Sequence, residues 1–142
     1  MPMIRKSITI NAPVEKVFEY ISNPENMLEW WPNVTAIRDV TRHGEKQMWT
    51  WDYKMMGLHF TGTAKVTCSR LNYERRVESK GGMEAEWYWG FSPVDGGTQL
   101  RWVIDYTIPM PVLGKVSELF MMQRNRRVAR MVMTNIKERM EA

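Results

Sequence analysis

Few side chains in this sequence are suited to acid–base or nucleophilic chemistry. Of the two histidines, His43 stands beside a turn glycine and His59 on the polar phase of an alternating stretch. Asp52 and Asp105 also fall on polar phases, so these side chains are expected to face solvent. General acid–base catalysis needs groups that converge within hydrogen-bond reach of a substrate. The sequence therefore predicts no catalytic residue.

Metal and cofactor chemistry has equally little support. No spacing of His, Cys, Asp and Glu is typical of a metal site, and no glycine-rich loop is suited to phosphate binding. The single cysteine, Cys68, lies on an apolar phase and is interpreted as a small core residue. We expect no metal and no cofactor.

The same cysteine count bears on the cellular compartment. One cysteine excludes an internal disulfide and is typical of a reducing environment. The first residues lack the apolar core of a signal peptide, and no run of about 18 apolar residues is present that would span a membrane. These features predict a cytoplasmic protein without stable membrane insertion.

Aromatic side chains are abundant, with seven Trp among 142 residues. In residues 83–108, Trp87 and Trp89 share the odd phase, and after a turn at 95–97 Trp102 lies on the even, apolar phase. Strict alternation of this kind is typical of β-strands with one face in water. The turn joins the two halves into an antiparallel hairpin whose covered face is dominated by aromatic rings.

The rest of the chain predicts the elements that position these rings. Pro13 is expected to begin a helix, and Asn23 to cap a second short helix that carries Trp30 and Trp31. The predicted strands are residues 3–11, 34–42, 46–56, 58–69, 73–79 and the two halves of 83–108, and the long C-terminal helix is roughly 112–141.

Because the strands and helices are segregated, this order predicts an α+β fold in one domain, residues 1–142. We expect a curved seven-stranded antiparallel sheet wrapped around the long C-terminal helix, with two short helices after the first strand. A cavity would lie between sheet and helix. An empty cavity of roughly 400 Å3 would cost about 10 kcal/mol, so either a ligand or water occupies it or the Trp rings fill it.

The predicted cavity lining combines the apolar phases of the strands with one face of the long helix. On a helical wheel, Arg124 and Arg127 fall near Phe120 and Met131. A buried, unpaired arginine is very unfavourable, so both either extend to the rim or meet an acidic partner such as a ligand carboxylate. The predicted ligand-binding residues are Trp49, Trp51, Tyr53, Phe60, Trp87, Trp89, Trp102, Tyr106, Phe120, Arg124, Arg127 and Met131.

The charge of the chain is concentrated in the long helix. Residues 112–142 hold seven Lys or Arg against three Glu, which equals the formal net charge of +4 of the whole chain. A basic helix is compatible with nucleic acid or an anionic membrane, but a solvated helix face explains it too, and we expect no nucleic-acid partner. The apolar turn at residues 55–58 is expected to guard the cavity mouth, to contact a partner or membrane, or to pack on the second short helix.

Three stretches, residues 8–18, 23–34 and 135–141, carry a resemblance to a known group. On these motifs the chain resembles the START-like superfamily, also called the birch-pollen-allergen-like or SRPBCC group, and within it the bacterial polyketide cyclase/dehydrase and lipid-transport branch. The resemblance covers essentially the whole chain and implies the helix-grip fold. It also implies binding of a lipid, sterol, polyketide or other apolar molecule, although fold does not settle function.

Three functions stay open at this point. The favoured one is a carrier or sensor that binds an apolar or amphipathic small molecule in the cavity. The first alternative is an enzyme of the polyketide cyclase/dehydratase type. The second is a module that docks on a membrane or a protein, and a homodimer is left open.

Overall fold

The computed structural model describes residues 3–43 and 46–142, except the side chain of His43; the turn predicted at Gly44 lies outside the described residues. The elements in chain order are β1 (Met3–Ile10), α1 (Val14–Ser22), the 3-10 turn η1 (Pro24–Asn26), α2 (Met27–Trp30), β2 (Val34–His43), β3 (Lys46–Met55), β4 (Leu58–Arg70), β5 (Glu74–Gly81), β6 (Ala85–Val94), β7 (Gly97–Tyr106), α3 (Met110–Leu113) and α4 (Glu118–Glu141).

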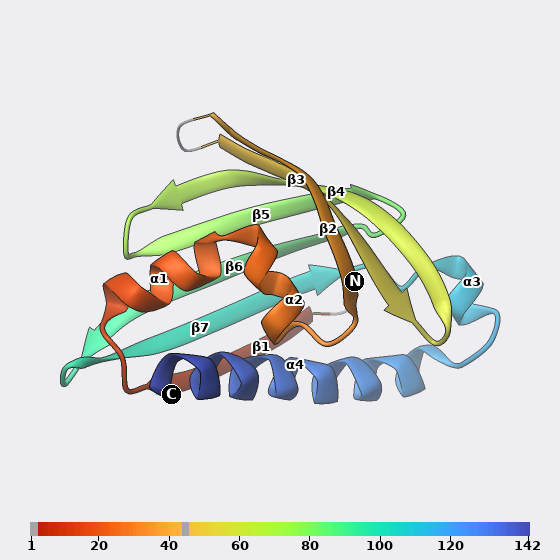
Figure 1. Cartoon of the computed structure of the whole chain (residues 1–142). Helices are drawn as coiled ribbons and strands as arrows, with labels where there is room; N and C mark the ends of the chain where they lie inside the picture. Colours follow the sequence, from red (N-terminus) through yellow and green to blue (C-terminus); the bar gives the residue numbers. More distant parts are fainter. Residues whose placement is uncertain (1–2, 44–45) are drawn as a thin grey trace.

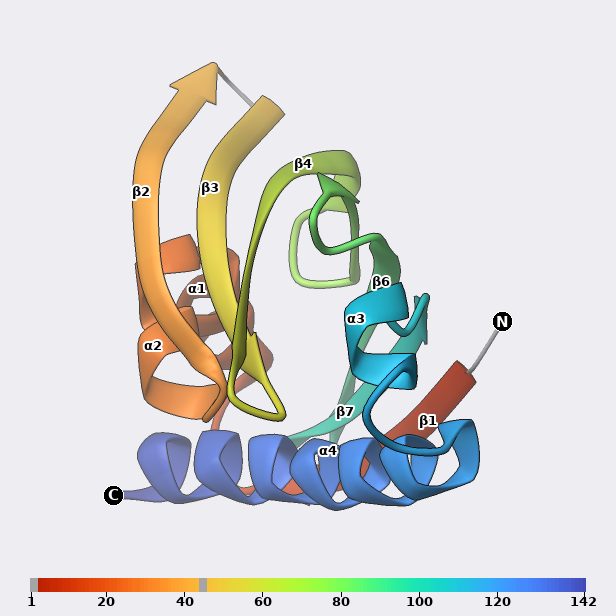
Figure 2. The ribbon, with the colours of Figure 1, turned by 90° about the vertical axis from the view of Figure 1, so that its right-hand side faces the viewer.

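In the described part of the chain, seven strands form one antiparallel sheet in the order β1-β7-β6-β5-β4-β3-β2. Figure 1 shows α1 and α2 in front of the sheet and α4 along its lower edge, and Figure 2 shows the sheet curving over α4. α4 packs on β1 at one end of the sheet and on α2 near the other. The predicted α+β helix-grip arrangement is confirmed.

The alternation along each strand determines which side chains face inward. Trp87 lies opposite Ile104 and Trp89 opposite Trp102 in the β6–β7 pair, so these four share the concave face. All four are buried, whereas Glu86, between the two tryptophans of β6, is exposed. The predicted inward registers are confirmed for Trp49, Trp51, Trp87, Trp89 and Trp102.

α1 and α2 cover part of this concave face. The 3–4 spacing in α1 buries Val17 and Phe18, and the Phe18 ring meets Phe91 of β6 edge-on with 5.0 Å between centroids. Asn23 caps the following turn by accepting a hydrogen bond from the Glu25 N–H, as predicted. The chain then enters α2, and Trp30 at its last position and Trp31 directly after it are both buried in the core.

The predicted long helix is wrong at its N-terminal end. A short helix, α3, ends at Leu113, and α4 begins only at Glu118. The residue just before α4, Ser117, has an extended backbone, and its Oγ accepts a hydrogen bond from the Phe120 N–H at 3.1 Å. A serine cap of this kind favours a new helix start over an uninterrupted helix.

A close approach in the middle of the sheet requires a glycine. Trp51 Nε1 donates to Ser79 Oγ at 2.8 Å, and Ser79 Oγ donates to the Met83 carbonyl oxygen at 2.7 Å. Gly62 lies beside this chain of hydrogen bonds, and a Cβ there would stand 2.7 Å from Ser79 Oγ and 3.0 Å from Trp51 Nε1. The glycine therefore leaves room for the buried indole N–H to reach its acceptor.

Gly62→Ala is expected to lower the free energy of unfolding by about 1–3 kcal/mol, because the added methyl group forces Trp51 and Ser79 apart. Urea denaturation followed by Trp fluorescence measures this change. Gly114→Ala is the matched control, since a Cβ at Gly114 meets its nearest atoms at an ordinary 3.7 Å. Equal stability of the two variants would contradict the steric argument.

Candidate functional site

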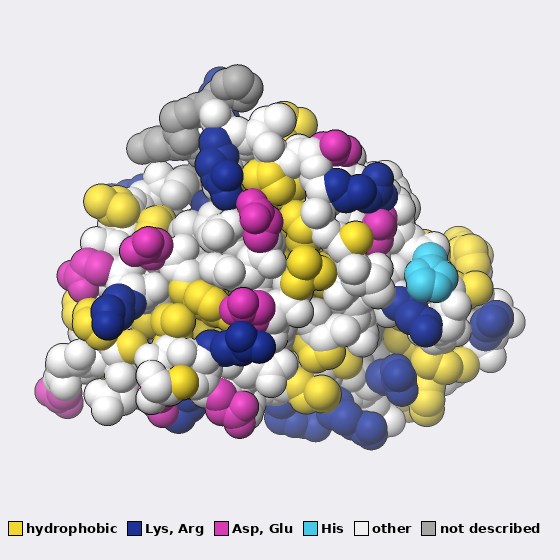
Figure 3. All heavy atoms as spheres, viewed as in Figure 1, with side chains coloured by type: hydrophobic (Ala, Val, Ile, Leu, Met, Phe, Trp, Pro, Cys, Tyr) yellow, Lys and Arg dark blue, Asp and Glu magenta, His cyan; other side chains and the backbone are white. Residues whose placement is uncertain are grey.

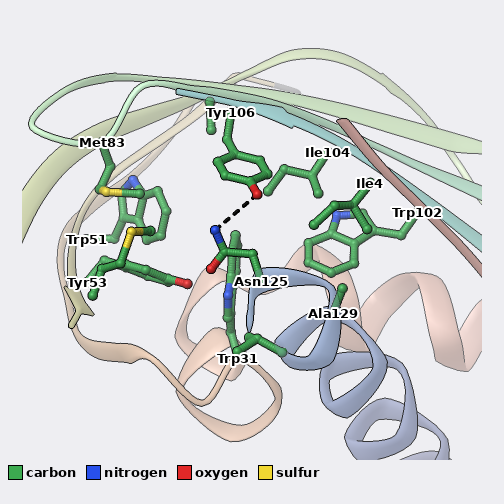
Figure 4. A pocket seen from close by; sticks show the side chains of 13 residues that line it. Ile4, Trp31, Trp51, Tyr53, Met83, Trp102, Ile104, Tyr106, Asn125 and Ala129 are labelled. Carbon is green, nitrogen blue, oxygen red and sulfur yellow. Dashed lines mark hydrogen bonds between the residues drawn. The ribbon is translucent and has the colours of Figure 1, made fainter. Parts of the chain in front are cut away.

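An apolar pocket lies between the concave face of the sheet and α4 (Figure 4). The strand residues reach it because alternate side chains share a face, and the α4 residues because they are three or four positions apart. Its wall consists of Ile4, Trp31, Trp51, Tyr53, Met55, Met83, Ala85, Trp102, Ile104, Tyr106, Asn125, Val128 and Ala129.

The pocket is nearly filled by its own side chains. Its volume is about 30 Å3, enough for roughly one water molecule, whereas small-molecule sites usually measure roughly 300 Å3 or more. The ring of Trp31 takes much of the space, with centroid distances of 5.2 Å to Trp51, 5.7 Å to Tyr53 and 5.4 Å to Trp102. The sequence left two states open: an open cavity that holds ligand or water, and a cavity filled by Trp rings. The structure has the second state.

Two tyrosine–asparagine pairs lie at the pocket. Asn125 Nδ2 donates to the Tyr106 hydroxyl at 3.0 Å (Figure 4), and Asn33 Nδ2 donates to the Tyr53 hydroxyl at 3.3 Å. Burial raises the pKa of both tyrosines, and the asparagine hydrogen bonds oppose that rise in part. Both phenols are therefore protonated at neutral pH, so they can donate a hydrogen bond to a ligand but do not act as bases.

A polar group in the pocket wall lacks a partner. Among the described residues, the buried Trp102 Nε1 has no hydrogen-bond partner, and the same holds for the indole nitrogens of Trp30 and Trp49. Leaving a buried donor unpaired costs about 1–3 kcal/mol. Because Trp102 lines the pocket, an acceptor on a bound molecule would recover part of that cost.

The predicted strand residues divide into two groups. Those in the pocket wall are Trp51, Tyr53, Trp102 and Tyr106. Those outside the wall are Trp49, Trp87 and Trp89, which are buried, and Phe60, which is half-buried against the core. Direct ligand contact by any of these residues stays a prediction.

The predicted helix contribution to the pocket is wrong. Phe120, Arg124, Arg127 and Met131 are exposed, and both arginines therefore extend toward solvent, as in the first of the two arrangements left open. α4 buries a different face, which carries Met121, Asn125, Ala129, Val132, Met133 and Ile136. The apolar residues of α4 form two lines around its axis, and only the packing partner decides which line turns inward.

Trp31 and Asn125 are pocket residues that the sequence did not predict. The pattern places Trp31 in the second short helix but gives no direction for its side chain, which depends on how that helix meets the sheet. Asn125 and Ala129 follow the buried Met121 at intervals of four, so their shared helix face was readable once Met121 was known to be inward.

The apolar turn between β3 and β4 borders the pocket. Met55 is buried in the pocket wall, and Met56 and Leu58 are partly buried against the core. Two of the roles expected for residues 55–58 are compatible with this placement: covering the entrance of the pocket, and packing locally against the core.

The remaining candidate groups lie away from the pocket. His59 is exposed, as expected, whereas Asp105 is half-buried rather than solvent-facing. Cys68 is half-buried rather than a core residue, because the β4–β5 pairing shifts register next to it.

Within residues 3–43 and 46–142, no cluster of His, Cys, Asp and Glu is suited to holding a metal ion. No helix in the described ranges combines the length and apolarity needed to cross a membrane.

A comparison with protein families agrees with this geometry. Residues 1–141 match the family model described as polyketide cyclase / dehydrase and lipid transport. The comparison with curated proteins found no match.

Several solved structures share the fold along nearly the whole chain. The protein TTHA0849 of Thermus thermophilus is 21% identical with a TM-score of 0.84, and the match covers 98% of this chain and 97% of that one. A START superfamily protein of Mycobacterium smegmatis is 16% identical with a TM-score of 0.79, covering 98% and 97%. The Zhui aromatase/cyclase of Streptomyces sp. R1128 is 15% identical with a TM-score of 0.78, covering 98% and 93%. At these identities the likeness shows the fold alone.

Asn125→Leu is expected to lower the free energy of unfolding by about 1–3 kcal/mol, because it leaves the buried Tyr106 hydroxyl without its donor. Adding Tyr106→Phe removes the stranded hydroxyl, so the double variant is expected to recover most of the loss. Chemical denaturation of the two single variants and the double variant measures the coupling. Strictly additive losses would show that the pair makes no mutual contribution.

Proposed function

Because the chain belongs to the polyketide cyclase / dehydrase and lipid transport family, we propose that it binds an apolar or amphipathic small molecule between the sheet and α4. The observation that carries this proposal is the chemistry of the pocket wall. Apolar side chains make up most of it, and the Tyr106–Asn125 pair and the unpartnered Trp102 N–H supply a few polar contacts. Ligand sites commonly combine these two features.

Binding requires the wall to move, because the pocket volume is only about 30 Å3. Holding roughly 300 Å3 open without a ligand would cost about 7 kcal/mol, so a collapsed pocket is the expected ligand-free state. Met55 and Met83 stand on the sheet side of the wall, and methionine changes rotamer at little cost. We infer that these two side chains and the Trp31 ring shift when the ligand enters.

An enzyme of the cyclase/dehydratase type is the alternative. The description of one structural relative as an aromatase/cyclase supports it. Among the described residues that form the pocket wall there is, however, no His, Asp, Glu, Lys or Arg, and burial keeps its two tyrosines protonated. Apolar binding with hydrogen-bond donation accounts for such a wall more simply than proton abstraction does.

The exposed apolar side chains around α3 and the start of α4 support a docking role as a further alternative. Met110 is 76% exposed and Leu119 65% exposed, and Lys115 lies between them in sequence. Figure 3 shows hydrophobic and basic side chains side by side at this end of the molecule, in the lower right. Such a surface suits a second copy of the chain or an anionic membrane.

A cytoplasmic location stays a proposal, supported by the unpaired Cys68.

A fluorescent fatty acid is expected to bind with a micromolar-range Kd, measured by the rise in probe fluorescence. Ala129→Phe places a ring in the pocket and is expected to weaken binding about tenfold or more, since the wall can no longer open fully. Met131→Phe puts the same ring on the exposed face of α4 and is the matched control. His59→Ala is also expected to leave binding unchanged.

Equal binding by the Ala129 and Met131 variants would refute the pocket as the binding site. Turnover of a polyketide-like substrate that is abolished by Tyr106→Phe would instead favour the enzyme.

A further inference from the structure

A second and much larger hollow lies outside the pocket described above. It is an open cleft of about 800 Å3, within the size range of small-molecule sites. α1, the ends of β2 and β3, and the turn between β4 and β5 enclose it, and Figure 1 shows these segments at the same end of the molecule. Most of the residues in its wall carry polar or charged groups, although most of the exposed area of the wall is apolar. The lining residues are Glu15, Lys16, Phe18, Glu19, Tyr20, Ser22, Asn23, Asn26, Arg42, Gln47, Leu71, Asn72 and Met140.

A buried arginine lies directly behind this wall. Arg75 of β5 is only 4% exposed, and its Nη2 donates to Oε1 of Gln47, a cleft residue, at 2.6 Å. Its guanidinium group also stands 5.9 Å from the centre of the Trp49 ring. A guanidinium has five N–H donors, and Gln47 accepts one of them.

No carboxylate in the described part of the chain forms an ion pair with Arg75. Burial, and then the charge of Arg42, lower the pKa of Arg75 to about 10, so the group is still a cation at neutral pH. Glu15 and Glu19 line the cleft from α1, but both are exposed. The protein therefore keeps a desolvated positive charge that it does not neutralise, which is unfavourable.

A second guanidinium shares this end of the concave face. Arg42 lies opposite Gln47 in the β2–β3 pairing, so both side chains leave the sheet on the same side. Arg42 donates to Asn23 Oδ1 at 3.2 Å and lies 3.6 Å from Glu25 Oε1, and its side chain is exposed. The cleft is thus bordered by one buried cation and one exposed cation.

We propose that this cleft binds a small molecule through an oxyanion, a carboxylate or a phosphate, which contacts the guanidinium groups of Arg75 and Arg42. A planar guanidinium matches both groups with paired N–H···O bonds. Gln47 lines the cleft and accepts the Arg75 hydrogen bond, so it is the side chain that would have to rotate for the ligand to reach the buried cation. The oxyanion of the bound ligand would then be the counter-ion that the positive charge of Arg75 lacks within the protein.

This site is distinct from the apolar pocket and does not depend on it. Trp89 separates the two: it is the cross-strand neighbour of Arg75 on β6, and its other side stacks on Trp102 of the pocket wall at 5.0 Å between centroids. An oxyanion in the cleft and an apolar ligand in the pocket would therefore occupy opposite sides of one aromatic layer.

Isothermal titration calorimetry of the full chain with sodium phosphate and, separately, sodium benzoate tests the proposal, with ionic strength held constant by sodium chloride. Saturable binding of at least one anion is expected. Arg75→Met and Arg42→Gln are each expected to weaken it about 10- to 100-fold, the usual effect of losing a charge-assisted hydrogen bond. Arg76→Gln is the matched control, since Arg76 is the next residue, exposed and stacked over Tyr88.

The two titrations separate the sources of the oxyanion, because binding of phosphate alone or of benzoate alone identifies the group recognised. Without anion, Arg75→Met is expected to melt at the same temperature as the native chain or higher, because a buried charge without a carboxylate partner does not stabilise the fold. If the Arg75 variant fails to fold, the anion titration of the Arg42→Gln variant tests the proposal instead, because Arg42 is exposed. Absence of saturable binding by both anions, or binding that survives both substitutions, would overturn the proposal.

Discussion

The contact on which the rest of the structure depends is the packing of α2 on the aromatic face of the sheet. Trp31 meets Trp51, Trp87 and Trp102 with ring centroids 5.2 to 5.5 Å apart. Trp30 meets Trp89 edge-on at 5.5 Å. Aromatic pairs of this kind contribute about 0.5–1.5 kcal/mol each beyond the burial of their area. Together they hold α2 against the sheet, and α4 packs in turn on α2 and β1.

This aromatic layer divides the interior into two environments with different chemistry. On the side of α4 the rings leave an apolar pocket of about 30 Å3, where dispersion and a few hydrogen-bond donors would act on a ligand. On the side of α1 they support an open cleft of about 800 Å3, lined by several charged and amide side chains, with a buried arginine behind its wall. Strong recognition of charge is therefore expected in the cleft, and recognition of apolar area in the pocket.

Much of the fold was predictable because it follows from local rules. The Asn23 cap, the inward phase of Trp87 and Trp89, and the antiparallel hairpin were all read correctly from spacing. The candidate site was only partly predictable. Arg124 was placed at the cavity from a helical wheel and is exposed, whereas Arg75 is the buried arginine. A wheel reports relative angles around a helix but not which angle faces the sheet.

What the sequence by itself determined is the inward face of the regular strand segments: a period of two allows only two registers, and the apolar phase selects one. Where the pairing shifts register, as beside Cys68, the alternation no longer decides the face. The tertiary structure alone decided three further features: which line of α4 turns inward, whether the Trp rings leave an open cavity, and where a cation lacks its counter-ion. Each depends on how side chains from distant segments pack together. The volume left between Trp31 and Ala129 is a property of that packing, and no spacing along the chain encodes it.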